Sequence, residues 1–494
     1  MLPLFPVFLG LLAVLLAWHF LNVQRARSKL PPGPAPLPII GNLGLLGFQI
    51  HHETLLKMAS TYGNVYTIWL GHTPIVVLNG FQAVKEVLIS RSEEFAERPV
   101  PSFLRDLIGD AHGILFSNGH PWKQQRRFSL MTLRNLGLGK TILEDSIRQE
   151  ASGIIQAFTR ENGRPIDPYS FLLSSVNNVI ASMLFGHSFS PEETIFRQII
   201  EGSRALEEFG GKLWARLYDV FPMGVGPLKP ILNKSLLALR HWKKLQRIIE
   251  EEVQEHQKSW TSEEPRDFID LYLAQVEKCK DDPTSTFTNT NMVQVVIELF
   301  TAGSDTSTVA LYWALLYMME YPEIQEQVQK ELDTVLGSSH VIRYEDQKKL
   351  PFTNAVLHET QRVSSLSALG IMHKSIKDTN IKGMPIHKGV IVMPNIFSVH
   401  YDPEQWETPR KFNPGHFLDK DGNFIKKDAF ILFSAGVRVC LGEKMARTTL
   451  FILFASLLRA FRFQLPEGVK EINKKPKLGL VMAPQLYKTC AIPR

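Results

Sequence analysis

The stretch Phe433-Ser-Ala-Gly-Val-Arg-Val-Cys-Leu-Gly442 constrains the fold of this chain more than any other. It frames Cys440 with glycines directly before a long, mostly apolar segment, residues 445–463, which predicts a helix. Glycines let a flat ligand approach the backbone, and a helix N-terminus with nearby N–H groups stabilises a thiolate. Such a thiolate suits an axial ligand to haem iron, the electron-donating kind that favours O–O cleavage. The alternative is that Cys440 is a small buried hydrophobe.

Five positions of this stretch match the haem-thiolate signature of the cytochrome P-450 family without departure: Phe433, Gly436, Arg438, Cys440 and Gly442. The chain therefore resembles that family. The resemblance implies a mainly α fold with a smaller β-rich part. It also implies haem b, iron protoporphyrin IX, whose iron binds the Cys440 thiolate. The other four matched residues would then belong to the haem-binding loop.

Length and composition fit one large catalytic unit. The chain has 494 residues, of which 44% are hydrophobic and 21% charged, so it can bury a sizeable core. Its net charge of +6 suits an anionic membrane surface or an acidic partner, and no nucleic-acid module is present. The three cysteines form neither a disulfide framework nor a CxxC pair, which indicates a reducing compartment.

The N-terminus predicts a membrane anchor. Residues 1–23 lack Asp, Glu, Lys and Arg, and as a helix of about 34 Å they would span a bilayer. Arg25, Arg27 and Lys29 follow, and such charges keep this flank cytosolic. A cleaved signal peptide would want positive charge before the apolar run, so an uncleaved anchor is favoured. Residues 24–38 would form a basic, proline-rich and stiff hinge, and residues 39–494 the haem-thiolate domain.

Several side chains could neutralise the two haem propionates. Trp122 and Arg126 share one face of a helix expected to begin near Pro121. An indole N–H and a guanidinium can both donate to a carboxylate. The resemblance adds Arg98, His373 and Arg438 to the propionate partners.

Residues 292–319 predict a long helix that contains Phe300-Thr-Ala-Gly-Ser-Asp-Thr-Ser307. The Thr306 hydroxyl can turn back to the Ala302 carbonyl and open the helix locally. Asp305 and Thr306 are an acid and an alcohol, the parts of a proton relay, and the resemblance gives them that catalytic role. This segment departs from the commonest family form, in which Thr, Glu and Thr replace Ser304, Asp305 and Ser307. A simple helix kink is the alternative.

Glu359 and Arg362 are spaced i, i+3 on one helix face. On its own such a pair is a weak signal, because exposed ion pairs contribute little. The resemblance adds His416 as the third member of a buried network that supports the cysteine loop. These three roles are structural.

The resemblance also assigns apolar residues to the substrate pocket. A loop at 98–119 would cap the substrate and a segment at 210–227 would form a lid. The predicted pocket residues are Phe103, Leu115, Phe116, Phe209, Phe300, Ala302, Leu366 and Met482.

The function implied is a monooxygenase that inserts one atom of O₂ into a lipophilic substrate, by hydroxylation or epoxidation. The resemblance is to the animal microsomal branch that oxidises drugs, fatty acids and steroids. It suggests a xenobiotic or a polyunsaturated fatty acid such as arachidonic acid. Because the chain has no flavin or nicotinamide motif, electrons would come from NADPH through NADPH–cytochrome P-450 reductase, with cytochrome b5 as a second donor. The location implied is the endoplasmic reticulum membrane, with the catalytic domain on the cytosolic face.

Two alternatives stay open. One is a haem-thiolate isomerase or lyase that rearranges peroxides without a reductase, although such chemistry does not need Asp305 and Thr306 for proton delivery. The other is a membrane-tethered lipid or sterol carrier without catalysis, against which the intact motifs argue.

Overall fold

The structure is a computed structural model. It describes residues 4–47, 50–102, 105, 112–136, 141–190, 192–210, 233–261, 264–337, 341–477 and 479–494. The predicted pocket residue Phe103 and most of the predicted lid at 210–227 lie outside the described residues. Phe209 lies within helix α8, but its side chain is outside the described part.

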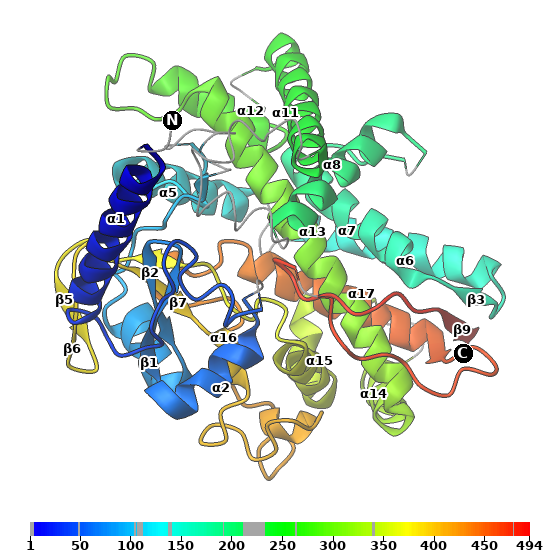
Figure 1. The fold of residues 1–494 in the computed structure, drawn as a ribbon. Coiled ribbons are helices and arrows are strands. Elements are labelled where there is room, and N and C mark those ends of the chain that lie inside the picture. Colours follow the sequence, from blue (N-terminus) through cyan, green and yellow to red (C-terminus); the bar gives the residue numbers. More distant parts are fainter. Residues whose placement is uncertain are drawn as a thin grey trace.

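Helix α13 (Asn289–Glu320) runs through the middle of the molecule (Figure 1) and is buried along most of its length. It begins three residues before and ends one residue after the predicted helix at 292–319. It packs mainly on α7 (Pro168–Leu184), α15 (Pro351–Ser364), α11 (Asn233–Ser259) and α17 (Glu443–Ala460). The fold is mainly helical with a small β part, as predicted.

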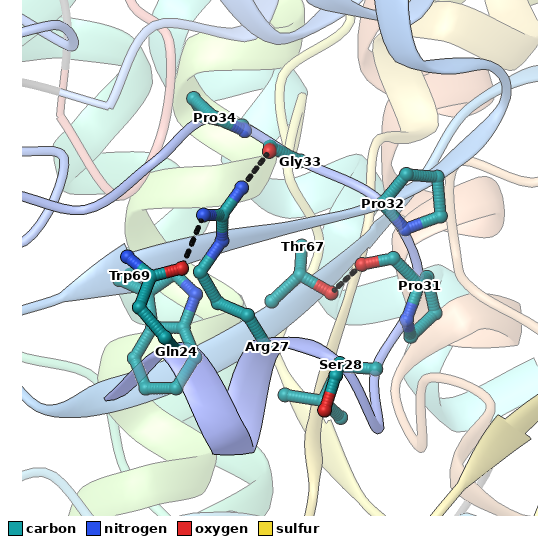
Figure 2. Close-up of a pocket in the computed structure, with 10 residues that line it drawn as sticks. Gln24, Arg27, Ser28, Pro31, Pro32, Gly33, Pro34, Thr67 and Trp69 are labelled. Atoms are coloured by element: carbon teal, nitrogen blue, oxygen red, sulfur yellow. Dashed lines mark hydrogen bonds between the residues drawn. The ribbon is translucent and has the colours of Figure 1, made fainter. Parts of the chain in front are cut away.

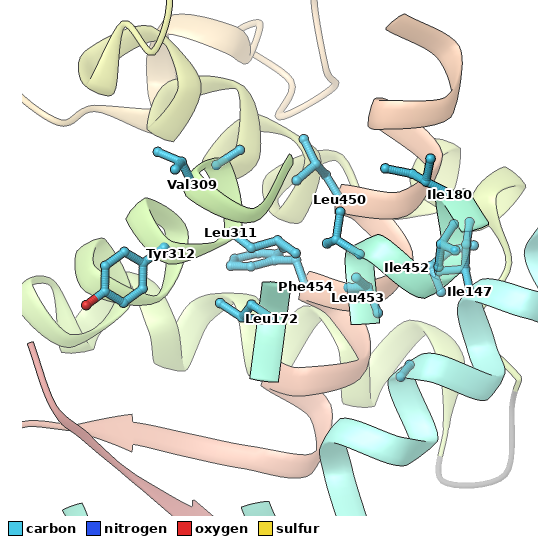
Figure 3. Packing of buried hydrophobic residues seen from close by; sticks show 14 of the residues in the cluster. Ile147, Leu172, Ile180, Val309, Leu311, Tyr312, Leu450, Ile452, Leu453 and Phe454 are labelled. Carbon is cyan, nitrogen blue, oxygen red and sulfur yellow. The ribbon is translucent and has the colours of Figure 1, made fainter. Parts of the chain in front are cut away.

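Helices α13, α17 and α7, with α6 (Thr141–Arg160), enclose the largest core. Figure 3 shows Leu311 of α13 near Phe454 and Leu453 of α17, with Leu172 of α7 beside them. Both α13 and α17 are hydrophobic on several faces because each is covered on several sides. This packing fixes the central helix against the helix that follows the cysteine.

The remaining helices surround this core. Their bounds are α2 His52–Tyr62, α3 Gly80–Lys85, η1 Glu86–Ser90, α5 Gly119–Asn135, α8 Thr194–Gly210, α12 Phe268–Lys278, α14 Pro322–Leu336, η2 Tyr344–Lys349, α16 Ile396–His400, η3 Pro414–Phe417 and η4 Gly436–Arg438.

In the described residues the β part consists of three small sheets. The largest has the order β1-β2-β7-β4, with β2 and β7 parallel and the other pairs antiparallel. Strands β1 and β2 form an antiparallel hairpin that turns between Leu70 and Thr73. The predicted helix after Cys440 ends at Ala460, and the chain continues as strand β8. The strand bounds are β1 Val65–Leu70, β2 Thr73–Leu78, β3 Pro165–Ile166, β4 His373–Lys374, β5 Thr379–Ile381, β6 Met384–Ile386, β7 Ile391–Pro394, β8 Phe461–Gln464 and β9 Thr489–Pro493.

The first helix, α1, spans Leu4–Arg27. Among the residues described, no helix meets the combined length and apolarity that crossing a bilayer requires, so the predicted membrane-spanning helix at 1–23 is not confirmed.

The proline-rich hinge is held against β1. Thr67 donates two hydrogen bonds to it. Its N–H donates to the Pro32 carbonyl at 2.8 Å, and its hydroxyl donates to the Pro31 carbonyl at 2.8 Å. Arg27 donates to the Gln24 side chain and to the Gly33 carbonyl (Figure 2). A recess of about 260 Å³ lies here, and none of its lining residues belongs to α13 or to the cysteine loop. Proline stiffness alone therefore does not set the path of the hinge, because strand β1 also holds it.

Candidate functional site

The cysteine loop, residues 433–442, is fixed by its own backbone and by a close neighbour. The Cys440 N–H donates to the Phe433 carbonyl at 2.8 Å, which closes the loop. Gly436 has φ +69°, and a Cβ there would lie 1.9 Å from the Leu88 carbonyl oxygen of η1. Only glycine permits this approach. Cys440 then lies just before the first turn of α17, at Glu443.

The Cys440 side chain is accessible although protein surrounds it, the combination expected of a residue that lines an internal recess. Burial raises the pKa of the thiol. A hydrogen bond from the Gly442 backbone and the positive charges of Arg126 and Arg98 lower that pKa, whereas Glu443 raises it. These groups therefore offset part of the cost of burying a thiolate, and a bound cation would offset the rest.

Three guanidiniums gather beside the cysteine. Arg126 donates to the Val439 carbonyl at 2.6 Å, next to Cys440. Arg98 and Arg438 are both buried. The Arg98 backbone N–H and the Arg438 guanidinium both donate to the Asn118 side-chain oxygen, and the Arg98 guanidinium donates to the Leu115 carbonyl at 2.8 Å. Burial lowers the pKa of Arg98 to about 10, and the charge of Arg126 adds to this effect. Burial lowers the pKa of Arg438 to about 8, and the charges of Arg98 and Arg126 lower it further. So much buried positive charge calls for an anion.

The predicted propionate partners differ in what they have left to donate. Arg438 directs four hydrogen bonds to the protein, to the carbonyls of Ala96, Ile114 and Ser117 and to the Asn118 side chain, and its guanidinium lies 3.8 Å from the Trp122 ring centroid. By contrast, Arg98 Nε and Trp122 Nε1 are buried and have no partner among the described atoms. Two unpaired buried N–H groups fit a ligand that carries carboxylates, as haem does.

His373 lies in β4 at the same cluster. Its Nδ1 is 2.8 Å from the Phe95 carbonyl oxygen, so Nδ1 carries a proton and Nε2 is the nitrogen left for a ligand. Burial and the charges of Arg98 and Arg438 lower its pKa to about 3. A propionate placed here would raise the His373 pKa, because its negative charge favours the protonated imidazole. His373 therefore fits a carboxylate neighbour as the three arginines do.

A residue that the sequence did not single out, Glu298 of α13, holds the predicted cap loop. Its carboxylate accepts from the backbone N–H groups of Ile114 at 2.6 Å and Leu115 at 2.9 Å, and from the Gln294 side chain at 3.0 Å. Gly113 has φ +82°, and a Cβ there would lie 2.3 Å from a Glu298 carboxylate oxygen, so glycine is favoured at this position. Burial raises the pKa of Glu298, and its hydrogen bonds and the charge of Arg98 oppose the rise.

The middle of α13 carries the predicted acid and alcohol. The Thr306 hydroxyl donates to the Ala302 carbonyl at 2.6 Å, as expected from the spacing. The hydroxyls of Ser304 and Thr308 turn back in the same way, yet α13 stays helical throughout. Ala302 and Thr306 are exposed within an otherwise buried stretch, whereas Asp305 is buried. The face that carries Ala302 and Thr306 is therefore open to a small molecule.

Glu359, Arg362 and His416 lie together and are buried. Arg362 makes two bonds to the Glu359 carboxylate, at 2.7 and 2.8 Å, and His416 Nδ1 is 3.1 Å from the same carboxylate. Arg362 also donates to the carbonyls of His400, Pro409 and Lys411. The network thus ties α15 to the segment that leads to the cysteine loop.

The predicted pocket residues fall into two groups. Leu115 and Phe116 are half-buried in the loop that Glu298 holds, and Ala302 is exposed on α13. Phe300 is buried against Phe185 in the core. Leu366 and Met482 are buried together, because the Met482 N–H donates to the Leu366 carbonyl at 2.9 Å. Only the first group offers accessible surface in the described structure.

A buried helix with one accessible face, a cysteine loop and a set of unpaired buried donors are the features expected of a haem-thiolate protein. The family model "Cytochrome P450" matches residues 31–491. Cytochrome P450 2J2 of Homo sapiens is 38% identical over 98% of this chain and 95% of its own length. Cytochrome P450 2C23 of Rattus norvegicus is 39% identical over 98% and 97%, and cytochrome P450 2A13 of Homo sapiens 37% over 98% and 98%. The chain belongs to the cytochrome P450 family. It is an oxidoreductase, a monooxygenase whose cofactor is haem held by a cysteine thiolate and whose cosubstrate is O₂.

Proposed function

We propose that Cys440 is the thiolate ligand of the haem iron in this monooxygenase. Its support is the closed loop around Cys440, the exposure of this residue and the three guanidiniums near it. When bound, haem supplies the site for O₂ activation. Arg98, Trp122, Arg126, His373 and Arg438 would then face the propionates. Arg98 and Trp122 would supply the N–H donors, and Arg438 would act mainly through its charge because its donors are largely used.

Protons would reach the reacting oxygen through Asp305 and Thr306. Thr306 is accessible on α13, and its hydroxyl, held on the Ala302 carbonyl, can accept a hydrogen bond and pass a proton on. Asp305 is buried beside it and would return the proton to that hydroxyl. The accessible surface of Ala302 leaves room for a substrate next to the relay.

The substrate we propose is a lipophilic xenobiotic or a polyunsaturated fatty acid such as arachidonic acid. Support comes from the apolar loop around Leu115 and Phe116. It also comes from the similarity to cytochromes P450 of several kinds, 2J2, 2C23 and 2A13. NADPH would supply electrons through NADPH–cytochrome P-450 reductase, with cytochrome b5 as a second donor. The chain itself carries no flavin or nicotinamide motif.

We further propose attachment to the endoplasmic reticulum membrane through α1, with the catalytic domain cytosolic. Its support is a row of exposed apolar side chains spaced three and four apart along α1: Val7, Leu11, Val14, Trp18 and Leu21. Such a stripe disfavours free solvent exposure. Alkaline carbonate extraction of microsomes tests this: release of the full chain into the supernatant would reject attachment, and retention would support it.

The observation that carries the proposed function is the pair of unpaired buried donors, Arg98 Nε and Trp122 Nε1, beside the accessible Cys440. The test is the difference spectrum of the dithionite-reduced, carbon-monoxide-bound protein, followed by turnover with reductase. A strongly red-shifted Soret band and NADPH-dependent product are expected. A band at the ordinary imidazole-like position would reject the thiolate ligand, and product formed equally without NADPH would favour an isomerase.

A further inference from the structure

Arg447, on the first turns of α17, contacts the start of its own helix and two other elements of the cysteine side, α15 and the cysteine loop. Its Nε and Nη2 both lie 2.9 Å from a Glu443 carboxylate oxygen. Its Nη1 lies 2.7 Å from Nε2 of His358 on α15. Its guanidinium carbon is 4.8 Å from the ring centroid of Phe433 in the cysteine loop. One planar group therefore joins an acid, an imidazole and an aromatic ring.

His358 is built to accept this bond. Its Nδ1 lies 2.8 Å from the Asn354 carbonyl oxygen, which places the proton on Nδ1 and leaves Nε2 as an acceptor. The ring is packed among the aromatic rings of Phe417, Phe424 and Phe430. Burial and the charge of Arg447 lower its pKa to about 3, so the imidazole is neutral. A neutral, fixed acceptor holds the Arg447 guanidinium in one orientation.

The residues that Arg447 holds lead directly to Cys440. The Phe433 carbonyl accepts the Cys440 N–H at 2.8 Å, so the ring under the guanidinium and the cysteine backbone belong to one closed loop. Glu443 places a negative charge near Cys440. Arg447 neutralises that carboxylate at 2.9 Å. Its side chain is mostly buried, which strengthens both contacts relative to an exposed pair.

We propose that Arg447 is a positioning residue for the cysteine loop. It fixes the Phe433 ring and cancels the Glu443 charge, and it thereby maintains the thiolate ligand and the reduction potential of the haem iron. This inference rests on the proposed function, since it assumes that Cys440 binds the iron. Among the described residues, Arg447 makes no direct contact with Cys440, so it does not touch the reacting atoms. Its effect passes through Phe433 and Glu443.

The experiment uses the full-length holoenzyme and four variants. Arg447→Met removes the charge at similar length, and Arg447→Lys keeps a charge without the planar fork. Glu443→Gln/Arg447→Met removes both members of the ion pair. Arg459→Met is the matched control, because Arg459 lies on the same helix about 18 Å away and donates to the Gly337 carbonyl. The readouts are the share and lifetime of the red-shifted band of the reduced carbon-monoxide complex, and the reduction potential.

Arg447→Met should lose the red-shifted band several-fold faster than the wild type and shift the potential to more negative values. The uncompensated Glu443 carboxylate disfavours the added electron. The double variant should recover the reduction potential, because the Glu443 charge is also gone. It should not recover the band lifetime, because the guanidinium that contacts the Phe433 ring is still absent. Arg447→Lys should recover the potential more than the lifetime, and it keeps the test decisive if Arg447→Met fails to bind haem.

Arg447→Met and Arg447→Lys variants that match Arg459→Met in both readouts would overturn the inference. A wild-type protein without the red-shifted band would instead reject the proposed function. The two failures are therefore distinct.

Discussion

The cysteine side and the substrate side of this molecule are held together by different kinds of contact. The cysteine side, formed by the cysteine loop with α15 and α17, relies on backbone bonds and buried charge pairs, such as Glu359 with Arg362. The other region, which we call the substrate side because it holds the predicted cap loop, comprises the loop at 112–118 and helices α8, α11 and α12. It relies on apolar packing and a few polar fixed points, chiefly Glu298. Polar contacts need particular residue types at particular spacings, whereas apolar packing accepts many.

The largest expected effect lies on the cysteine side. Cys440→Ala should abolish the red-shifted Soret band and all monooxygenase turnover, because no other thiol is placed to replace it: Cys279 bonds the Gln275 side chain and Cys490 lies in β9. Carbon-monoxide difference spectroscopy and product analysis measure this. Cys490→Ala is the matched control and should keep the band. Turnover retained by Cys440→Ala would show that the loop does not supply the ligand.

Between the two sides lies α13, which the Thr306→Ala variant tests. The spectrum should stay intact because the Thr306 hydroxyl bonds the Ala302 carbonyl and no other side chain or carbonyl of the described residues. Product yield per NADPH should fall on the order of 100-fold, the lower end of what positioned proton transfer contributes, with oxygen diverted to peroxide. Thr301→Ala is the control, since its hydroxyl bonds the Ile297 carbonyl in the same way. Unchanged coupling in Thr306→Ala would remove Thr306 from the relay.

The same contrast explains what sequence reasoning could reach. The cysteine loop, the Glu359–Arg362 pair and the back-bonded Thr306 follow from fixed spacings, and the structure brings each set together. His416 came from the family resemblance and joins the Glu359–Arg362 pair. Glu298 was missed because one acid in an apolar helix gives no spacing signal; only the fold shows which backbone N–H groups it meets. Arg438 was expected to bond propionates, yet three carbonyls from distant segments take its donors.

A smaller effect should follow loss of the main fixed point of the substrate side. Glu298→Gln removes the charge that accepts two backbone N–H groups of the cap loop, a loss of about 1–2 kcal/mol. Substrate dissociation constants from spectral titration should rise about 5- to 30-fold, and amide exchange at 113–118 should quicken. The carbon-monoxide band should keep its position.

The control for Glu298→Gln is Glu326→Gln on the exposed side of α14. If the carbon-monoxide band also changes its position in Glu298→Gln, Glu298 acts on the haem side, through Arg98, and not on the cap loop. Unchanged affinity and exchange would show that the loop is held by packing alone.

The smallest effect concerns a second polar fixed point on the substrate side, where α11 meets α12. His256 bonds the Asp267 carboxylate at 3.0 Å through Nε2 and the Glu252 carbonyl at 2.8 Å through Nδ1. Asp267 also caps α12, and Asp270 pairs with Arg266. These groups resemble a metal site in composition. Both imidazole nitrogens already face oxygen atoms, so the geometry favours a protonated histidine in a salt-bridge cluster.

His256→Gln should therefore change how stability depends on pH. Burial lowers the His256 pKa, but the bonds to Asp267 and Glu252 and the nearby carboxylates raise it to about 9 overall. Because the His256 pKa is raised in the folded state, the protonated imidazole stabilises the fold fully when the pH is below 6.5, the pKa of an ordinary histidine. This stabilisation is lost as the pH rises through about 9. The wild-type free energy of unfolding should fall across that window by up to about 3 kcal/mol. Urea titrations from pH 6 to 9 should show a flatter dependence for His256→Gln than for the exposed control His387→Gln, whereas equal slopes would mean that packing, and not this cluster, joins α11 to α12.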